Sequence, residues 1–233
     1  MNVLITGASK GIGKAISLNM ASNGHHLALC ARNLKDLQEL KVQIANLYPT
    51  VNVFIKEVDC SQKKAVQKFA ELSLSALGQI DVLINNVGVF VPSFILDEED
   101  DALDFHMQTN VYAPYYLYKK LASLMKERRF GYIFNICSVA SIETIVNAGS
   151  YCVTKSALLS LNNIMRKEMM DFEVKVTAIL PGSTLTSSWA GTSISPDEFI
   201  QPEDVALTID QIMKMSIGAN VDQIVIKPIH GQI

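Results

Sequence analysis

The amino-acid sequence predicts an α/β protein, in which a seven-stranded parallel sheet is doubly wound, with helices on both faces. Two observations predict this fold class. Seven short apolar runs alternate with helical patterns along the chain, and a glycine-rich turn joins the first run to the first helix. No repeat, low-complexity tract or linker divides the chain, so we expect a single domain over residues 1–233.

The expected strands cover residues 2–6, 27–31, 51–57, 80–85, 131–137, 174–180 and 222–227. The expected helices cover residues 12–23, 34–47, 62–76, 99–127, 150–171 and 203–215. Glycine and serine gather after the sixth strand, which predicts a short loop over a substrate site at about 183–200.

Composition narrows the class of protein. The chain has 233 residues, of which 49% are hydrophobic and 18% charged, with a net charge of −3, so we expect a globular protein that does not bind nucleic acid. No apolar run reaches the length of a membrane span, and the first strand starts almost at Met1. We therefore expect a cytoplasmic protein without a membrane partner. Four histidines and four cysteines lack paired ligand spacing, which indicates reduced thiols and no metal site.

The turn after the first strand, residues 6–13, reads Thr-Gly-Ala-Ser-Lys-Gly-Ile-Gly. Glycines allow backbone N–H groups to approach a ligand, and the following helix N-terminus offers unpaired donors and partial positive charge to a pyrophosphate. The turn therefore predicts a bound dinucleotide. A tight turn that only packs the strand on the helix is the alternative.

Arg32 and Asn33 follow the second strand, where the adenosine ribose of a dinucleotide would lie. A carboxylate there would bind the 2′-hydroxyl of NAD, whereas an arginine accommodates the 2′-phosphate of NADP. Lys10, inside the glycine turn, supplies a second cation. Together they predict NADP(H) as cofactor, although a solvated arginine is common at a strand end.

The fifth expected strand ends at Ser138, and Tyr151 and Lys155 open the next helix. A spacing of four places both side chains on one helix face, where the ammonium favours the phenolate form of tyrosine and prepares it for acid–base chemistry. Ser138 can donate a hydrogen bond to a carbonyl oxygen. Taken alone, a Tyr-x3-Lys pair is more often a lysine packed beside a tyrosine.

These motifs resemble the short-chain dehydrogenase/reductase family over nearly the whole chain. The shared motifs are Thr-Gly-x3-Gly-x-Gly in the first turn, Asn-Asn-x-Gly at residues 85–88, and the serine followed by Tyr-x3-Lys. The resemblance implies a Rossmann-like fold and an NADP(H)-dependent oxidoreductase that reduces a carbonyl. Val87 stands where the family usually has alanine, and Thr184 where it usually has valine.

The resemblance also implies roles for individual residues. Tyr151 would protonate the substrate oxygen, Lys155 would bind the nicotinamide ribose, Ser138 would orient the carbonyl, and Asn110 would connect the proton path to solvent. The resemblance also implies that Asp59 meets the adenine of the cofactor. A helix N-cap is an equally plausible interpretation of Asp59 from the local sequence. The full set implied to contact the cofactor is Gly7, Ser9, Lys10, Gly11, Ile12, Gly13, Arg32, Asn33, Asp59, Cys60, Asn86, Val87, Gly88, Tyr151, Lys155, Pro181, Gly182, Thr184 and Thr186.

The substrate is less closely defined. The segment 221–231 lacks the Gly-Gly ending of 3-oxoacyl-carrier-protein reductases and resembles sepiapterin-reductase-like ketone reductases, so we expect a small or medium ketone with Trp189 and Phe199 as apolar walls. An acyl-thioester substrate is the alternative. A non-catalytic NADP(H)-binding regulator ranks lower, because such a protein should lose the tyrosine or lysine. The resemblance further implies a homodimer or homotetramer through the helices at 99–127 and 150–171.

Overall fold

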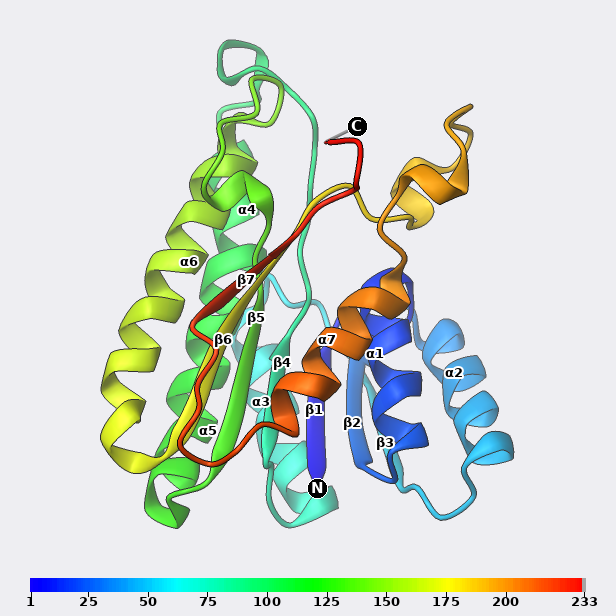
Figure 1. The fold of residues 1–233 in the computed structure, drawn as a ribbon, viewed down its shortest axis with the longest axis vertical. Coiled ribbons are helices and arrows are strands. Elements are labelled where there is room, and N and C mark those ends of the chain that lie inside the picture. The colour runs from blue at the N-terminus through cyan, green and yellow to red at the C-terminus, as the bar shows by residue number, and fades with distance from the viewer. Residues whose placement is uncertain (232–233) are drawn as a thin grey trace.

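The computed structural model describes residues 1–231 and contains a seven-stranded sheet in the order β3-β2-β1-β4-β5-β6-β7, with every pair parallel (Figure 1). The strands are β1 (Asn2–Thr6), β2 (His26–Ala31), β3 (Val53–Glu57), β4 (Val82–Asn85), β5 (Gly131–Ile136), β6 (Val174–Pro181) and β7 (Gln223–Ile226). The helices are α1 (Gly11–Ser22), α2 (Leu34–Leu47), α3 (Lys63–Leu77), α4 (Ala102–Met107), α5 (Ala113–Arg128), α6 (Gly149–Met169) and α7 (Pro202–Met213). The predicted fold class is confirmed.

The strands divide their apolar side chains between two helical layers. Val3 and Ile5 point to the layer of α1, α2 and α7, whereas Leu4, between them, points to the layer of α3, α5 and α6. This alternation follows from the two-residue period of a strand. All three side chains are completely buried, so the sheet is covered on both faces, as parallel sheets require.

The expected single helix over 99–127 is wrong in detail. The structure has α4, a π-helical turn over Gln108–Tyr112, and then α5. Pro114 lies in the first turn of α5 and has no N–H to donate to the carbonyl of Asn110, so the regular α-helical ladder cannot continue through this point. Such π turns are frequent at functional sites, and this one contains Asn110.

A ladder of buried asparagines ties the centre of the sheet to α6. Asn85 on β4 donates to the side-chain oxygen of Asn135 on β5 at 2.8 Å, and Asn135 donates to that of Asn162 on α6 at 2.9 Å. Asn135 and Asn162 are fully buried. Because buried amides need partners, this ladder fixes β4, β5 and α6 relative to one another.

Replacing Asn135 with alanine should lower the free energy of unfolding by roughly 2–4 kcal/mol, because the buried amides of Asn85 and Asn162 each lose a partner. Urea denaturation followed by circular dichroism measures the change. Asn46→Ala, at an exposed position of α2, is the control and should change stability by less than about 0.5 kcal/mol. Equal stability of the two variants would contradict a structural role for the ladder.

Candidate active site

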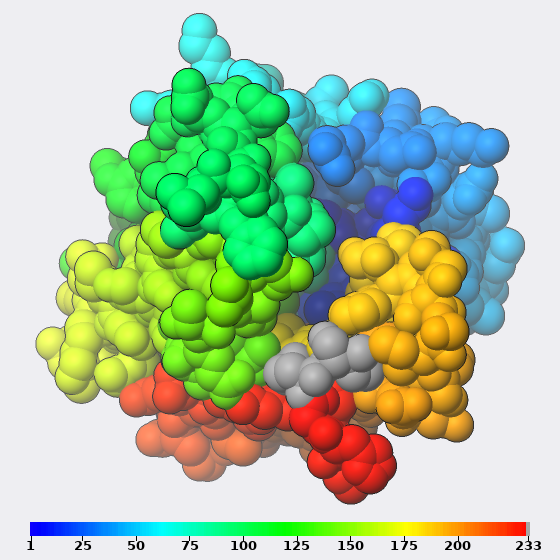
Figure 2. All heavy atoms as spheres, turned by 90° about the horizontal axis from the view of Figure 1, so that it is seen from above, coloured from blue at the N-terminus to red at the C-terminus, as the bar shows by residue number. Residues whose placement is uncertain are grey.

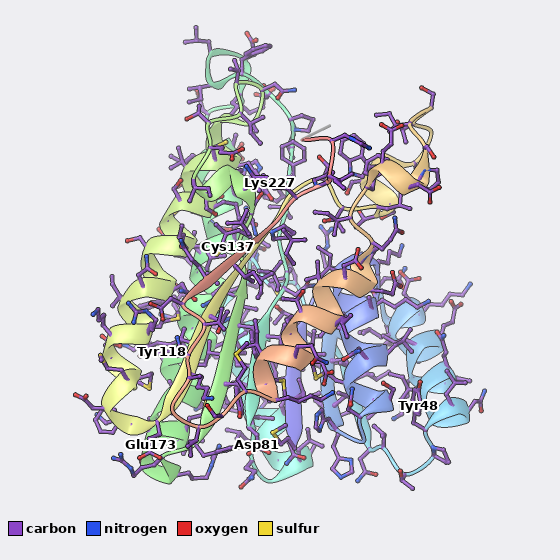
Figure 3. The ribbon with its side chains drawn as sticks, viewed as in Figure 1. Tyr48, Asp81, Tyr118, Cys137, Glu173 and Lys227 are labelled. Carbon is purple, nitrogen blue, oxygen red and sulfur yellow. The ribbon has the colours of Figure 1, made fainter. Side chains whose placement is uncertain are left out.

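The predicted site residues gather where the strands end. In Figure 3, Cys137, just after β5, and Lys227, just after β7, lie in the upper half of the molecule, while Asp81 and Glu173 lie at the opposite end. A cleft of about 490 Å³ opens at this edge of the sheet. Figure 2 looks into the hollow, with the N-terminal segment in blue at its bottom and the segment after β6, in yellow and orange, along one side.

The glycine turn forms one wall of the cleft and is packed too tightly for side chains. Gly7 and Gly11 have φ angles of +64° and +49°, which favour glycine. A Cβ added at Gly13 would lie 2.1 Å from the carbonyl oxygen of Gly7, and one at Gly11 would lie 2.9 Å from the methyl carbon of Thr186. The turn therefore holds β1, α1 and the segment after β6 in close contact.

Helix α1 presents its N-terminus to this cleft. Within residues 1–231, no side chain caps the helix at Lys10, and its first turn contains no acidic residue. The first-turn residues Gly11, Ile12 and Gly13 line the cleft together with Ser9. A helix N-terminus in this arrangement binds an anionic group well, so the turn fits the pyrophosphate of a dinucleotide.

The end of β4 is fastened to the glycine turn. The side-chain amide of Asn86 donates to the backbone oxygens of Thr6 and Gly7 at 2.9 and 3.0 Å. The backbone N–H of Val87 donates to the Thr6 hydroxyl at 3.0 Å, and its side chain packs against the cluster beneath α3 and α5. The valine that replaces the family's usual alanine therefore contacts the core on one side and lines the cleft on the other.

The other end of the cleft is polar. Arg32, Asn33, Asp59 and Cys60 all line it. Asn33 is the N-cap of α2 and accepts a hydrogen bond from the Asp36 N–H at 3.2 Å. Asp59 accepts from the Ser61 N–H at 2.9 Å in a local turn, and α3 has its N-cap at residue 62, so the alternative interpretation of Asp59 as that N-cap is wrong.

Lys10 has an acidic partner that the sequence did not indicate. Its ammonium lies 3.0 Å from a carboxylate oxygen of Asp36, which lines the same cleft as Arg32. Asp36 could be recognised from the sequence as an acidic residue three positions after the Asn33 cap, but its position beside Lys10 depends on how α2 leaves the sheet. The charge of Lys10 is thus partly neutralised at the place where a 2′-phosphate was expected.

Asn110 is buried in the π turn and fully engaged. Its side-chain oxygen accepts from the Val89 N–H at 2.8 Å, and its amide donates to the Val89 carbonyl at 3.1 Å and to the Thr154 hydroxyl at 3.0 Å. Asn110 therefore joins the segment after β4 to α6, the helix that carries Tyr151 and Lys155.

Lys155 is a buried cation beside Tyr151. The lysine is 3% exposed, and its ammonium donates to the Ile136 carbonyl at 2.8 Å and lies 5.7 Å from the centre of the Tyr151 ring. A Cβ added at Gly88 would lie 3.4 Å from this ammonium and 3.6 Å from the side-chain oxygen of Asn110. The absence of a side chain at Gly88 leaves space next to both polar groups.

Ser138 is oriented by the turn that follows it. Its hydroxyl oxygen accepts from the Ala140 N–H at 3.1 Å, and its own N–H donates to the Ser141 hydroxyl at 3.3 Å. Because one lone pair is used in this way, the hydroxyl retains its proton to donate to a substrate oxygen. Burial raises the pKa of the neighbouring Cys137 thiol to about 12, which keeps that group neutral.

Most of the expected cofactor contacts lie in the cleft wall. Those that line it are Gly7, Ser9, Lys10, Gly11, Ile12, Gly13, Arg32, Asn33, Asp59, Cys60, Asn86, Val87, Gly88 and Thr186. Those that do not are Tyr151, Lys155, Pro181, Gly182 and Thr184. The lining residues that sequence reasoning missed are Ala31, Asp36, Val58, Ser61, Val89, Phe105, Thr109, Ser187 and Ser188. Many of these residues line the cleft because they lie at strand ends or helix starts, but none of them belongs to a motif recognisable in the sequence.

The segment after β6 differs from expectation in two places. Thr184 is buried, and its hydroxyl donates to the Gly182 carbonyl at 2.9 Å. Phe199 is only 5% exposed and packs on the Trp189 ring, with a centroid distance of 4.9 Å. Phe199 therefore supports the loop from inside and is not the open apolar wall that we expected, because the aromatic pair buries it.

The described residues contain neither a metal-binding cluster nor a membrane-spanning helix. Across residues 1–231, no three histidine, cysteine, aspartate or glutamate side chains are grouped so that they could hold a metal ion. None of the helices in the same range combines the length and the apolar character needed to cross a membrane.

Comparison with known proteins agrees with this geometry. A family model described as short chain dehydrogenase matches residues 1–195. The chain is 29% identical over 242 residues to a sepiapterin reductase of Chlorobaculum tepidum, covering 99% of this chain and 97% of that protein. It is 27% identical over 226 residues to an uncharacterized oxidoreductase of Staphylococcus aureus, covering 97% of this chain and 96% of that one.

Two solved structures share the fold. An alcohol dehydrogenase from the archaeon Thermococcus sibiricus, complexed with 5-hydroxy-NADP, has a TM-score of 0.92 at 24% identity and covers 100% of this chain and 98% of that one. L-sorbose reductase from Gluconobacter frateurii, complexed with NADPH and L-sorbose, has a TM-score of 0.90 at 25% identity. The match covers 97% of this chain and 95% of that one. Because the family model matches most of the length of this chain, the chain belongs to the short-chain dehydrogenase/reductase family.

Proposed function

We propose that this protein is an NADPH-dependent oxidoreductase that reduces a ketone to an alcohol, with Tyr151 as the proton donor. The observation that carries the proposal is the buried ammonium of Lys155, held between the Ile136 carbonyl and the Tyr151 ring. Burying a lysine is costly unless its charge is used or paired, and here the ammonium lies beside the Tyr151 phenol.

NADP(H) fits the cleft. The uncapped start of α1 suits the pyrophosphate, and Arg32 suits a 2′-phosphate at the far end. The Gluconobacter reductase was solved with NADPH, which supports the same cofactor here. When bound, NADPH supplies the hydride for the carbonyl carbon.

The protein's own side chains supply the remaining chemistry. Tyr151 gives its proton to the carbonyl oxygen as negative charge develops there, and Ser138 donates a hydrogen bond to the same oxygen. The Lys155 ammonium stabilises the phenolate that Tyr151 becomes, and it binds the nicotinamide ribose. Asn110 holds the Val89 backbone and Thr154 in place. The resemblance to the family supports a further role for Asn110, which is to link the proton path to solvent.

Replacing Tyr151 with phenylalanine should lower kcat for ketone reduction by about 100-fold or more, because the general acid is lost while the ring remains. NADPH oxidation is measured against small ketones, diketones, sepiapterin-like compounds and 3-oxoacyl thioesters. The Kd of the variant for NADPH, measured from the cofactor's fluorescence, should stay within about twofold of the wild-type value. A loss of about 1.4 kcal/mol of binding free energy would instead raise the Kd about 10-fold.

The same assay separates the alternatives. Turnover that persists in the Tyr151→Phe variant would refute this tyrosine as the acid. Tight NADPH binding by the wild-type protein without turnover of any compound would favour a regulator. Fastest turnover of the acyl thioesters would favour a 3-oxoacyl reductase.

The substrate that we propose is a small or medium ketone. Apolar side chains are exposed near Tyr151. Phe90, which contacts the Tyr151 ring, is at least half exposed, and so are Ile142 and Val146 in the loop that pairs with the segment of Phe90. The loop after β6 is closed at its base by a bridge between Thr184 and Ile200, so it forms a short, defined border. The similarity to a sepiapterin reductase supports a compact ketone over a long acyl chain.

Cofactor choice should respond in opposite directions to two substitutions. Arg32→Asp should reduce kcat/KM for NADPH relative to NADH by about 10- to 100-fold, because the charged hydrogen bonds to the 2′-phosphate are lost. Asp36→Asn should raise the same ratio by about two- to fivefold, because it frees the Lys10 charge. Steady-state kinetics with both cofactors test this pair, and an equal loss with both cofactors in Arg32→Asp would contradict the assignment.

We also propose a single domain over residues 1–233, with 183–200 as its substrate loop, and a cytoplasmic location. Three buried thiols, those of Cys30, Cys60 and Cys137, are free, which suits a reducing compartment.

A homodimer or homotetramer is proposed through α5 and α6. Tyr115 on α5 is 40% exposed, and Val153 and Ile164 on α6 are about half exposed. Exposed apolar side chains on two adjacent helices are typical of a symmetric contact.

Sedimentation equilibrium should therefore give a mass of two or four chains at micromolar concentration. Ile164→Asp should lower that mass by placing charges in the contact, whereas Val42→Asp, at an exposed position of α2, should leave it unchanged. A wild-type monomer at every concentration would contradict the proposal.

A further inference from the structure

The segment after β4 lies across the start of α6, and we name residues 89–98 the strap. The strap and the loop at 142–148 rise side by side above the sheet in Figure 1. The Ser93 N–H donates to the Asn147 carbonyl at 2.9 Å, and the Gly149 N–H donates to the Ser93 carbonyl at 3.4 Å. The strap thus follows the chain directly into the helix that carries Tyr151.

Glu98, at the end of the strap, caps α6 from outside the helix. One carboxylate oxygen accepts from the Ser150 N–H at 2.9 Å, and the other accepts from the Ser150 hydroxyl. Ala148, the N-cap residue of α6 in the structure, has no side chain able to do this. The two hydrogen bonds from Ser150 lower the pKa of the Glu98 carboxyl, so the cap is a carboxylate at neutral pH.

The strap also packs closely on the first turn of α6. A Cβ added at Gly149 would lie 2.3 Å from a side-chain carbon of Ile95 and 3.2 Å from the Glu98 carboxylate, so only glycine allows this approach. Two residues along the chain, the Tyr151 ring contacts the Phe90 ring with a centroid distance of 4.8 Å. The strap therefore contacts α6 on both sides of Ser150.

We propose that Glu98 is a positioning residue for Tyr151, acting through Ser150. The inference rests on the proposed function, because it assigns Glu98 the task of holding the proton donor in place. Ser150 is held at its backbone N–H and at its hydroxyl, and the side chain of the next residue, Tyr151, lies against the Phe90 ring and beside the Lys155 ammonium. A displacement of about 1 Å at a reacting group is enough to slow a reaction by about 100-fold.

The test compares Glu98→Ala and Ser150→Ala with the double variant. Each single change should lower kcat by roughly 10- to 100-fold, and the double variant should be no slower than the worse single one, because both remove the same contact. The Kd for NADPH should not change, since the glycine turn is untouched. Glu98→Gln, which keeps one acceptor for the Ser150 N–H, should recover part of kcat. Glu99→Ala, which removes an exposed carboxylate from the next position, is the matched control and should behave as wild type.

A solvent isotope effect distinguishes positioning from simple destabilisation. If Glu98 positions Tyr151, proton transfer becomes more rate-limiting in Glu98→Ala, and the ratio of kcat in H₂O to that in D₂O should rise. Unchanged kcat in both Glu98→Ala and Glu98→Gln would overturn the inference, as would a lower melting temperature accompanied by weaker NADPH binding. Absence of turnover in the wild-type protein would instead refute the proposed function itself.

Discussion

Both faces of the sheet are covered by helices, and this constraint leaves the carboxyl ends of the strands as the place where polar side chains meet a ligand. Val3 and Leu4 illustrate the constraint, because adjacent residues enter different apolar layers and neither position tolerates a charge. Where β1 and β4 end, backbone N–H and C=O groups no longer have partners in the sheet and need other hydrogen bonds. The Thr6 hydroxyl and the Asn86 amide satisfy the backbone groups that the sheet no longer pairs. The site is thus a consequence of how the sheet terminates.

The same edge has to accommodate one buried positive charge. Lys155 obtains a carbonyl partner from Ile136, at the end of β5, so the last residue of a strand supports the ammonium that adjoins Tyr151. Gly88 lies beside this charge, and a Cβ built there would be at ordinary contact distance from both the ammonium and the Asn110 side chain. The π turn then brings Asn110 against the Val89 backbone and α6. Strand ends, a glycine and an irregular helix turn therefore depend on one another around a single cation.

The sequence was sufficient for the fold class and for the residues of the motifs, because both depend on local patterns. The alternating apolar runs and the Tyr-x3-Lys spacing are visible within a few residues. The Lys10–Asp36 pair and the Glu98–Ser150 cap were not predicted, because each joins elements whose relative orientation no local pattern encodes. Glu98 belonged to an acidic run that favours the dipole of the next helix, and its contact with a helix 52 residues later arises only from the path of the strap. Pro114 is visible in the sequence, but the π turn was not predicted because it also depends on the contacts of Asn110 with Val89 and Thr154, which join distant parts of the chain.

The strap joins the exposed Phe90 to the start of the helix that carries Tyr151, the proposed proton donor. Its Phe90 faces both the solvent at the mouth of the site and the Tyr151 ring, while its far end caps the helix on which Tyr151 lies. A residue that lines the mouth and a residue that fixes the acid are therefore separated by only eight positions on one segment, which has few regular backbone hydrogen bonds of its own. Phe90 and Glu98 belong to the same short segment, so a movement of the chain at Phe90 would be transmitted to the contact with Ser150. Under the proposed function, the shape of a bound ketone and the placement of Tyr151 would therefore be coupled through the covalent path of the strap.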